Sequence, residues 1–353
     1  MIENQKITLG FVVSGEQYSE MSILSFYSLL KSLHCVAPKD HSLNKFISQI
    51  LIVTDNTNLS FVSFVRLWHS NVTVIKPSQW EKLLVPPMVN GSFATYYKFD
   101  LMEACSQDDS ILLYLDTDAF VVGDINIQFL LDRLGNVRNQ NSILMVPSHR
   151  PVLERTGYTR FTSPYAYFNA GFIFQKLNRR FEISQIIEHL KIFYPSGGES
   201  LIWHDQDLIN SYFGEEIKPL PLRWNISTGM LRKHYFAADK LNYLAIDEFL
   251  NPVIIHASGS VLTKLKKHYY PYREKILEVL DLALNEPMLK ESHLQSLRNF
   301  QKRILLSRKE RAVIGLRTFF GLTPECSTRI YADQIYWKMR LKRVKQKLIS
   351  SSN

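Results

Sequence analysis

A short apolar segment that ends at two carboxylates constrains this chain more than any other feature. Residues 111–115 read Ile-Leu-Leu-Tyr-Leu, and Asp116 and Asp118 follow with Thr117 between them. An apolar run of this length between polar residues is typical of a strand that is buried on both faces of a mostly parallel sheet. Such sheets bind ligands at the carboxyl ends of their strands. The two carboxylates could therefore coordinate one divalent cation, which in turn could hold the phosphates of a nucleotide.

The Asp-x-Asp pattern is too short to establish a metal site by itself. At average Asp usage a chain of this length contains such a pair by chance, so the apolar strand before it is what favours the metal interpretation. The length of 353 residues, with 46% apolar and 21% charged residues, suits one large α/β domain, alone or with an appendage. The same composition excludes a chain that is disordered throughout.

Cysteine content and targeting signals indicate a reducing compartment. Cys35, Cys105 and Cys326 are far apart and form no Cys-x-x-Cys pair, so neither a disulfide framework nor a thiolate zinc site is expected. The first residues lack the basic start and apolar core of a signal peptide. No apolar run approaches the roughly 18 residues of a membrane span. We therefore expect a cytoplasmic protein.

The positive charge is confined to the last part of the chain. Residues 301–353 hold 13 Lys and Arg against 3 Asp and Glu, whereas the first 300 residues hold 29 against 30. This distribution argues against a body that binds nucleic acid over a broad positive face. From about residue 327, apolar residues recur at helical spacing, from Trp337 to Leu348, with Lys and Arg between them. Such a basic amphipathic helix could lie on the anionic inner face of a membrane, or it could pack on the protein itself.

Strand and helix patterns alternate in the first part of the chain. Apolar runs predict strands at 7–13, 50–53, 72–75 and 111–115, and apolar residues at helical spacing predict helices at 22–33, 59–68 and 95–105. This alternation predicts an α/β fold with a mostly parallel central sheet. We expect residues 1–264 to form this single Rossmann-like domain. Residues 265–353 should form a helical C-terminal region that includes the basic tail.

Three further segments place polar or small residues beside apolar runs. The Asn-Ala-Gly sequence at 169–171 could let a ligand approach the backbone, although a turn before a core strand gives the same pattern. The Asp-Gln-Asp sequence at 205–207 fits the first turn of a helix, where acidic residues are favoured without any chemistry. His256 ends an apolar run and could give a neutral imidazole to the cation, although such a His more often only hydrogen-bonds within a fold.

In their order along the chain, these segments resemble the family 8 glycosyltransferases, retaining enzymes of the GT-A fold that use nucleotide sugars. The resemblance is to enzymes such as the bacterial lipopolysaccharide galactosyl- and glucosyltransferases, and it extends from about residue 7 to residue 260. Its motifs are the loop at 13–18, Tyr-Tyr-Lys-Phe at 96–99, Tyr-Leu-Asp-Thr-Asp at 114–118, Phe-Asn-Ala-Gly at 168–171, Asp-Gln-Asp-Leu-Ile-Asn at 205–210, and His-x-x-Gly at 256–259.

The resemblance implies a role for each motif. The implied metal ligands are Asp116, Asp118 and His256. The residues implied to bind the nucleotide and its diphosphate are Val13, Gly15, Tyr18, Lys98, Thr117, Gly259 and Lys264. Those implied to bind the donor sugar are Asn169, Ala170, Gly171, Asp205 and Gln206, of which Asp205 and Gln206 are the catalytic pair.

The chain also departs from the family pattern at two places. Lys98 stands where the family usually has Arg, so a bidentate contact would become a single point-charge contact. The late motif lacks the usual Pro and Trp, and Lys264 comes two places late. Whether Lys264 reaches the diphosphate is left open by this displacement.

The combined prediction is a retaining transferase that moves a hexose from a UDP-sugar to a glycan or glycolipid acceptor. Mn²⁺ suits two carboxylates and an imidazole better than Mg²⁺, the second choice. Gln206 is a poor nucleophile, which favours attack by the acceptor on the face that the nucleotide leaves. One alternative is a catalytically inactive nucleotide-sugar-binding protein of the same fold. Another is a metal-independent glycoside hydrolase, whose carboxylates lie about 5 to 9 Å apart across the sugar.

Overall fold

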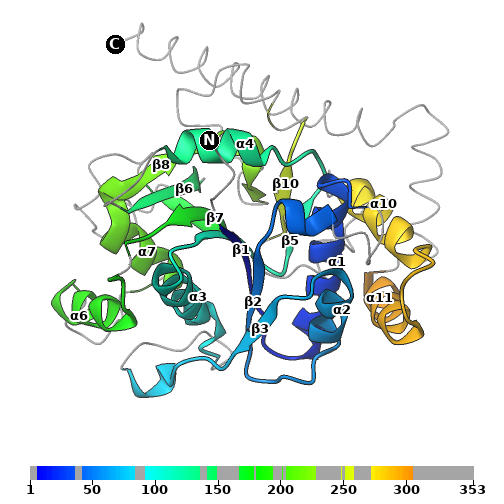
Figure 1. The fold of residues 1–353 in the computed structure, drawn as a ribbon, viewed down its shortest axis with the longest axis horizontal. Coiled ribbons are helices and arrows are strands. Elements are labelled where there is room, and N and C mark those ends of the chain that lie inside the picture. Colours follow the sequence, from blue (N-terminus) through cyan, green and yellow to red (C-terminus); the bar gives the residue numbers. More distant parts are fainter. Residues whose placement is uncertain are drawn as a thin grey trace, which may run out of the picture.

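A mostly parallel sheet lies at the centre of the molecule (Figure 1). The computed structural model describes residues 6–35, 42–83, 92–135, 141–148, 167–178, 180–193, 201, 204–227, 248, 251–257 and 272–304. Within them the sheet has seven strands in the order β3-β2-β1-β4-β7-β6-β8. The strands are β1 (Ile7–Val12), β2 (Gln49–Val53), β3 (Val72–Ile75), β4 (Ile111–Leu115), β6 (Ser142–Pro147), β7 (Phe168–Lys176) and β8 (Ile217–Pro219). Only β7 runs antiparallel to its neighbours, so the fold class expected from the sequence is confirmed.

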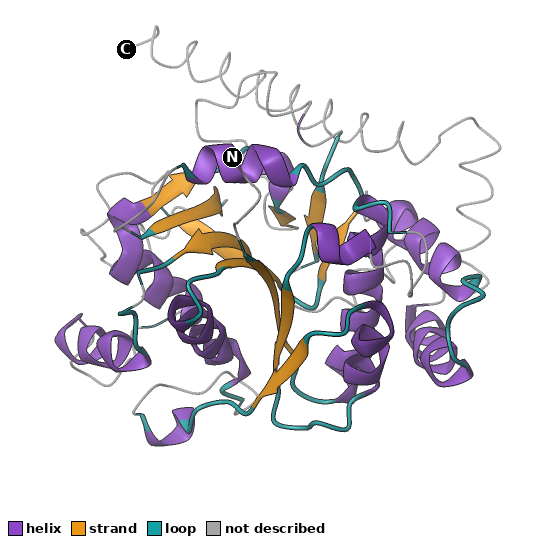
Figure 2. Cartoon of the chain, viewed as in Figure 1, coloured by secondary structure: helices purple, strands orange, loops and turns teal. Residues whose placement is uncertain are grey.

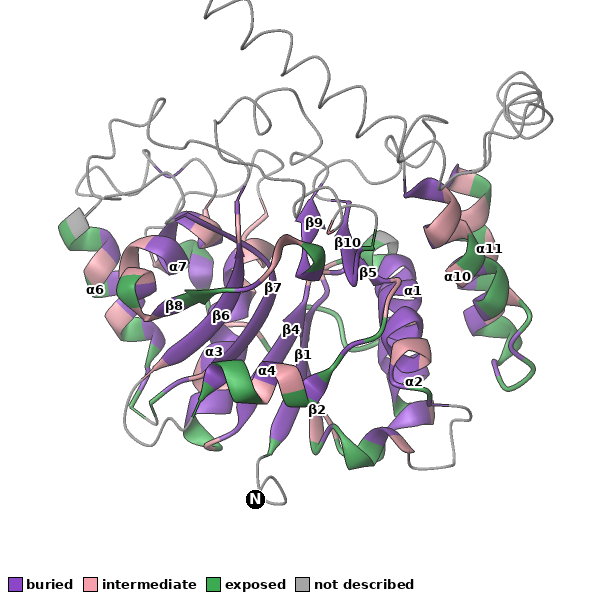
Figure 3. Cartoon of the chain, turned by 90° about the horizontal axis from the view of Figure 1, so that it is seen from above, coloured by how far each residue is buried: buried purple, intermediate pink, exposed green. Residues whose placement is uncertain are grey.

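Helices cover both faces of this sheet (Figure 2). They are α1 (Glu16–Ser32), α2 (Ser60–Trp68), α3 (Tyr97–Gln107), α4 (Ile127–Leu134), α6 (Ile183–Phe193), α7 (Asp205–Phe213), α10 (Arg273–Leu284) and α11 (Glu291–Ile304). Successive β4 residues serve opposite cores, since Leu113 packs with α1 and α2 while Leu112 packs with α3. This double covering explains why the central strands β1 and β4 are mostly apolar and are buried along their length (Figure 3).

The helix that follows β1 begins earlier than the apolar spacing predicts. It starts at Glu16 rather than near residue 22, because Gly15 takes a φ of 80° and turns the chain directly from the strand into the helix. The helix predicted at 95–105 begins as a 3₁₀ turn over Ala94–Tyr96 and continues as α3.

A second, three-stranded sheet joins segments that are far apart in the sequence. It consists of β5 (Ala119–Val121), β10 (Ile254–His256) and β9 (Ile226–Ser227), in the order β5-β10-β9. In the antiparallel pairing of β10 with β5, His256 lies opposite Ala119. The N–H of Ala257 also donates to the carbonyl of Asp118 over 2.9 Å. This small sheet therefore brings His256 beside the end of β4.

Strand β7 is irregular where it carries the Asn-Ala-Gly sequence. Its pairing with β6 runs through Leu144 opposite Phe174, then resumes with Val146 opposite Asn169, so the β7 side holds extra residues at this point. The sequence left open a turn before an ordinary strand, but the trio lies inside the strand. Bulges of this kind re-aim backbone groups and are common next to active sites.

Helices α10 and α11 pack against α1, and α11 also packs against α2. Tyr27 on α1 donates to Glu286, whose carboxylate lies 3.3 Å from Lys31 Nζ, and Ser63 on α2 contacts His293. The predicted boundary at residue 264 and the basic tail from about residue 327 lie outside the described residues. No helix among the described residues is long and apolar enough to cross a membrane.

Candidate active site

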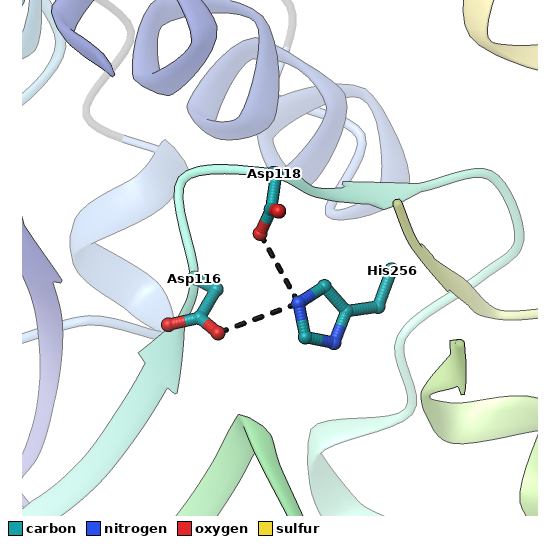
Figure 4. A group of neighbouring side chains, drawn as sticks. All are labelled: Asp116, Asp118 and His256. Atoms are coloured by element: carbon teal, nitrogen blue, oxygen red, sulfur yellow. Dashed lines mark ion pairs between the residues drawn. The ribbon is translucent and has the colours of Figure 1, made fainter. Parts of the chain in front are cut away.

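Three side chains with metal-binding atoms converge at the carboxyl end of β4 (Figure 4). His256 Nε2 lies 3.1 Å from Asp118 Oδ1 and 3.4 Å from Asp116 Oδ2. One ligand atom from each of the three residues lies within 4.8 Å of the others. The structure thus brings together the three residues for which the sequence implied a metal-binding role.

The backbone around β4 explains how the two carboxylates are held. Beyond the end of β4, the N–H of Asp116 donates to the carbonyl of Gly171 on β7 over 2.9 Å. The N–H of Ala119 then donates to the carbonyl of Asp116 over 3.0 Å, closing a turn that contains Asp118. Both carboxylates are therefore fixed by strands β4, β5 and β7.

The absence of a side chain at Gly171 makes room for His256. A Cβ at Gly171 would lie 2.2 Å from the imidazole of His256, well inside van der Waals contact. With any other residue, either the ring or β7 would therefore have to move. The sequence suggested that small residues here admit a ligand, and the structure shows that Gly171 first admits a histidine of the protein itself.

The chemistry of this group fits a divalent cation. His256 Nδ1 lies 3.1 Å from Asn169 Oδ1, which leaves Nε2 to face the two carboxylates. Burial opposes the charged imidazole, but Asp118 and Asp116 outweigh it and raise the pKa of His256 above its usual value. Burial also opposes the charge of Asp116, yet Lys98 and His256 lower the pKa of its carboxyl. Two carboxylates and an imidazole form a donor set that suits borderline cations such as Mn²⁺.

Lys98 connects the metal candidates to the start of α7. Its Nζ lies 2.6 Å from Asp205 Oδ2, 3.2 Å from Asp116 Oδ1 and 3.2 Å from the carbonyl oxygen of Ala170. Burial disfavours the ammonium, but the two carboxylates outweigh this effect and raise the pKa of Lys98. An ammonium has three N–H donors, and all three have protein oxygens within reach here.

Asp205 and Asp116 each have a further hydroxyl partner. Thr95 donates a short hydrogen bond to Asp205 Oδ1, and Tyr114 donates to Asp116 Oδ1 over 2.5 Å. Burial and the nearby Asp116 carboxylate raise the pKa of Tyr114 well above its usual value, so the phenol keeps its proton and remains a donor. The sequence gave no signal for Thr95, because only the fold brings α7 beside it.

Asn169 links His256 to Gln206. Its Oδ1 accepts from the N–H of Gly171 over 2.9 Å, and its Nδ2 donates to Gln206 Oε1 over 3.1 Å. Gln206 Oε1 also accepts from the N–H of Ala170 over 3.2 Å. The oxygen atoms of both amides are thus engaged by protein donors, and Asn169 could meet a sugar hydroxyl only as a donor.

Two further residues of the Asp-Gln-Asp-Leu-Ile-Asn sequence attach α7 to β7. The side chain of Asn210 accepts from the N–H of Phe168 over 2.7 Å and donates to its carbonyl over 2.8 Å. Asp207 accepts from the hydroxyl of Tyr167, the residue before β7, over 2.5 Å. These contacts show that Asp207 and Asn210 have a structural role, whereas Asp205 binds Lys98 and Gln206 binds Asn169.

Four of the residues implied to bind the nucleotide lie close after the ends of β1 and β4. Val13 is fully buried and its N–H donates to Val53, so its side chain cannot touch a ligand. Gly15 is exposed, Tyr18 on α1 is 43% exposed, and Thr117 lies between the two candidate carboxylates. The other two implied residues, Gly259 and Lys264, lie outside the described residues.

Comparisons with known proteins agree with this arrangement. A family model described as Glycosyl transferase family 8 matches residues 11–261. The chain is similar to a crystal structure of the galactosyltransferase LgtC in complex with donor and acceptor sugar analogs, with 18% identity, 82% of this chain and 99% of that chain covered, and a TM-score of 0.56. It is also similar to the apo structure of the bifunctional glycosyltransferase WbbM, with 18% identity, 84% and 51% covered, and a TM-score of 0.52. At these identities the two structures show the fold alone, and no curated protein matches the sequence.

Proposed function

The chain belongs to glycosyl transferase family 8, and on this premise we propose that it transfers a hexose from a UDP-sugar to a glycan or glycolipid acceptor, with retention of the anomeric configuration. The observation that carries the proposal is the convergence of Asp116, Asp118 and His256 at the carboxyl end of β4. In a glycosyltransferase this edge is where a nucleotide diphosphate and its cation belong, because ligands bind open α/β sheets there.

Asp116, Asp118 and His256 would hold the divalent cation, with Mn²⁺ as the first choice and Mg²⁺ as the second. The cation would supply Lewis-acid stabilisation of the charge that develops on the departing diphosphate. Three ligand atoms within 4.8 Å of one another favour this role over that of a hydrolase pair, whose carboxylates act from opposite sides of a sugar.

Lys98 and Asp205 would prepare the site for the donor sugar. Lys98 balances the carboxylates of Asp116 and Asp205 while its N–H groups are directed at protein oxygens. This arrangement supports a counter-ion role in place of the direct diphosphate contact implied by the resemblance. Asp205, held by Lys98 and Thr95, would accept a hydrogen bond from a donor hydroxyl. Asn169 and the backbone of residues 170–171 would complete the sugar pocket.

Gln206 would face the anomeric carbon as an orienting group. Two N–H groups donate to its Oε1. Both lone pairs of this amide oxygen are thus used in hydrogen bonds, which makes it a still poorer nucleophile. This contact supports attack by the acceptor on the face that the diphosphate leaves. A glycosyl adduct trapped on any side chain of the protein would overturn this part of the proposal.

At the other end of the site, Val13, Gly15, Tyr18 and Thr117 would contact the nucleoside, Val13 through its backbone. Gly259 and Lys264 remain candidates for the diphosphate. We also propose a cytoplasmic protein whose basic tail from about residue 327 binds the inner face of the membrane, where a lipid-linked acceptor would be found. If a chain without residues 327–353 partitions onto anionic vesicles as well as the full chain does, the tail has no such role.

A thermal shift experiment tests the proposed site. UDP should raise the melting temperature of the protein only when Mn²⁺ is present, because a ligand that binds the folded state stabilises it by mass action. Asp118→Ala should abolish this rise, whereas Asp124→Ala, a change at an exposed residue of the same segment, should not. Hexose transfer from radiolabelled UDP-sugars then separates the enzyme from an inactive nucleotide-sugar binder. A UDP effect independent of any metal, or none at all, would contradict the proposal.

A further inference from the structure

Two backbone N–H groups identify which atom of the Asn169 side chain is the oxygen, and which atom of the Gln206 side chain is. A backbone N–H can only donate, so the side-chain atom that meets the N–H of Gly171 must be the Asn169 oxygen. By the same argument, the Gln206 atom that meets the N–H of Ala170 must be its oxygen. The amino group of Asn169 then faces that oxygen. Neither amide can be turned over without setting an amino group against a backbone donor.

This order determines which nitrogen of His256 carries hydrogen. His256 Nδ1 lies 3.1 Å from the oxygen of Asn169, so in the neutral ring Nδ1 is the donor. Nε2 then has the free lone pair, and Nε2 is the atom that faces Asp116 and Asp118. Metal-binding histidines depend on such a partner, since the hydrogen bond of one nitrogen sets the tautomer and orientation of the other.

Asn225 holds Asn169 from the side away from Gln206. It lies between the 3₁₀ turn Leu222–Trp224 and strand β9, and β9 pairs with β10 so that Ser227 lies beside His256. Asn225 is fully buried, and its Nδ2 donates to Asn169 Oδ1 over 2.7 Å. This bond is shorter than the other two that Asn169 Oδ1 accepts.

The second amide atom of Asn225 shows what the residue contributes. Within the described part of the chain, Asn225 Oδ1 has no hydrogen-bond partner. An unpaired buried acceptor costs about 1–3 kcal/mol, and a leucine of similar size would avoid that cost. The benefit of an amide at this position therefore lies in its Nδ2 contact with Asn169.

We propose that Asn225 is a positioning residue that, through Asn169, keeps the imidazole of His256 as the Nδ1–H tautomer with Nε2 directed at Asp116 and Asp118. Among the described residues, the side-chain hydrogen bond of Asn225 goes to Asn169 and not to any of the three metal candidates, so we expect it to act through Asn169. The inference rests on the proposed metal site and extends it to a residue that no motif identifies. It predicts that metal affinity depends on an asparagine whose loss leaves all three candidate ligands in place.

Direct Mn²⁺ binding, followed by the electron paramagnetic resonance of the free ion, tests the proposal first. Asn225→Leu should weaken Mn²⁺ binding about tenfold, the lower end of the effect of losing an outer partner of a metal ligand. The matched control is Ser106→Ala, which removes another buried polar group. Ser106 donates to the carbonyl of Asn178 near the start of β4, at the opposite end of that strand from the site. Circular dichroism and melting temperature establish that both variants fold.

The ¹⁵N chemical shifts of His256 in the metal-free protein report its tautomer directly. A variant that only lowers the stability of the fold would leave this tautomer unchanged. In protein labelled with ¹⁵N-histidine, the signals of His256 are assigned as those that are absent from the spectrum of His256→Gln. The wild-type protein should show the Nδ1–H tautomer alone at a pH where the ring is neutral, and Asn225→Leu should add the Nε2–H tautomer. An unchanged tautomer in Asn225→Leu would overturn the proposal, whether or not Mn²⁺ binding weakens. Where the wild-type protein binds Mn²⁺, equal binding by Asn225→Leu would overturn it too.

The two measurements also separate this inference from the proposed function. If the wild-type protein binds no Mn²⁺ but Asn225→Leu changes the tautomer, the positioning role stands and the proposed metal site fails. If the wild-type protein binds Mn²⁺ and Asn225→Leu changes neither property, the metal site stands and the positioning role fails.

Discussion

The two ends of the candidate site are built differently. Around β7 and α7, polar atoms of Lys98, Asn169, Asp205 and Gln206 are bound to one another or to backbone before any ligand arrives. At the end of β1, by contrast, Gly15 and Tyr18 are exposed, and a Cβ at Gly15 would meet nothing within 4 Å. At the end assigned to the metal and sugar, the side chains are therefore held in place by the protein before a ligand binds. At the end assigned to the nucleoside, the residues are open to solvent, and a ligand would supply their contacts.

The largest effect should come from breaking the prearranged end at Lys98. Lys98→Met would leave the buried carboxylate of Asp205 and the partly exposed carboxylate of Asp116 without their cation, and removing one partner of a buried ion pair costs about 3–5 kcal/mol. We expect urea denaturation to show a loss of this size. Mn²⁺ should restore part of it, because it would supply positive charge beside Asp116.

Lys31→Met is the matched control for that variant. The side chain of Lys31 is 37% exposed, and its buried partner Glu286 keeps a second partner in Tyr27, so we expect a loss of about 1 kcal/mol, the upper end of the range for exposed pairs. Equal losses in the two variants would show that Lys98 is not a buried counter-ion and would weaken the contrast between the two ends.

Gly171→Ala should damage the same end through shape alone. Its new Cβ would stand 2.2 Å from the His256 ring, and the ring or β7 must move, so we expect Mn²⁺ affinity to fall about 100-fold, as when a metal ligand loses its support. Gly15→Ala gives the comparison at the open end. It should cost about 1 kcal/mol of stability, because φ there is positive, and leave Mn²⁺ affinity unchanged. Calorimetric titration of both variants checks the pair.

The pH dependence of metal binding gives a smaller effect. The pKa of His256 is raised by Asp118 and Asp116 against the opposing effect of burial, so below that raised pKa a proton occupies the ring and competes with the cation. Mn²⁺ affinity should therefore increase with pH, by at most about tenfold per unit for one proton, and level off only above the usual histidine pKa of about 6.5, once the ring is neutral. In His256→Asn this increase should be absent. An affinity that fell with rising pH would contradict the assignment.

Tyr18→Ala should have the smallest effect. Tyr18 is exposed, and stacking of a base on an aromatic ring contributes about 1–3 kcal/mol, so we expect the KM for a UDP-sugar to rise about tenfold with little change in kcat. The melting temperature of the ligand-free variant should stay within a degree or so of the wild-type value, because little buried contact is lost. A lower kcat with an unchanged KM would contradict this assignment, because it would indicate that Tyr18 acts on the reacting sugar and not on nucleoside binding.

The sequence predicted the strands and helices of this fold better than the tertiary contacts between them. Strands such as Ile111–Leu115 are found as expected, because apolar runs between polar turns are a local signal. The pairing of β10 with β5, which sets His256 beside Asp118, is a contact between distant segments and has no local signal. The resemblance to a family was needed to join His256 to the two carboxylates.

Several partners within the site could not be read from the chain for the same reason. Thr95 and Asn225 belong to no motif, and only the packing of α7 and β9 brings them to Asp205 and Asn169. The resemblance implied that Lys98 binds the nucleotide and its diphosphate. Its burial between two carboxylates depends on tertiary structure alone.

The irregular stretch of β7 has a consequence for anyone who wishes to redesign this protein. Four main-chain groups of residues 170–171 serve Asp116, Lys98, Asn169 and Gln206, and ordinary point mutations leave main-chain groups in place. Ala170 is itself buried in the core, so a library at this position would keep the anchors in place only with small side chains. Changes in donor preference should be sought at the tips of the surrounding helices and loops, where a substitution alters the ligand's surroundings without removing the support beneath them.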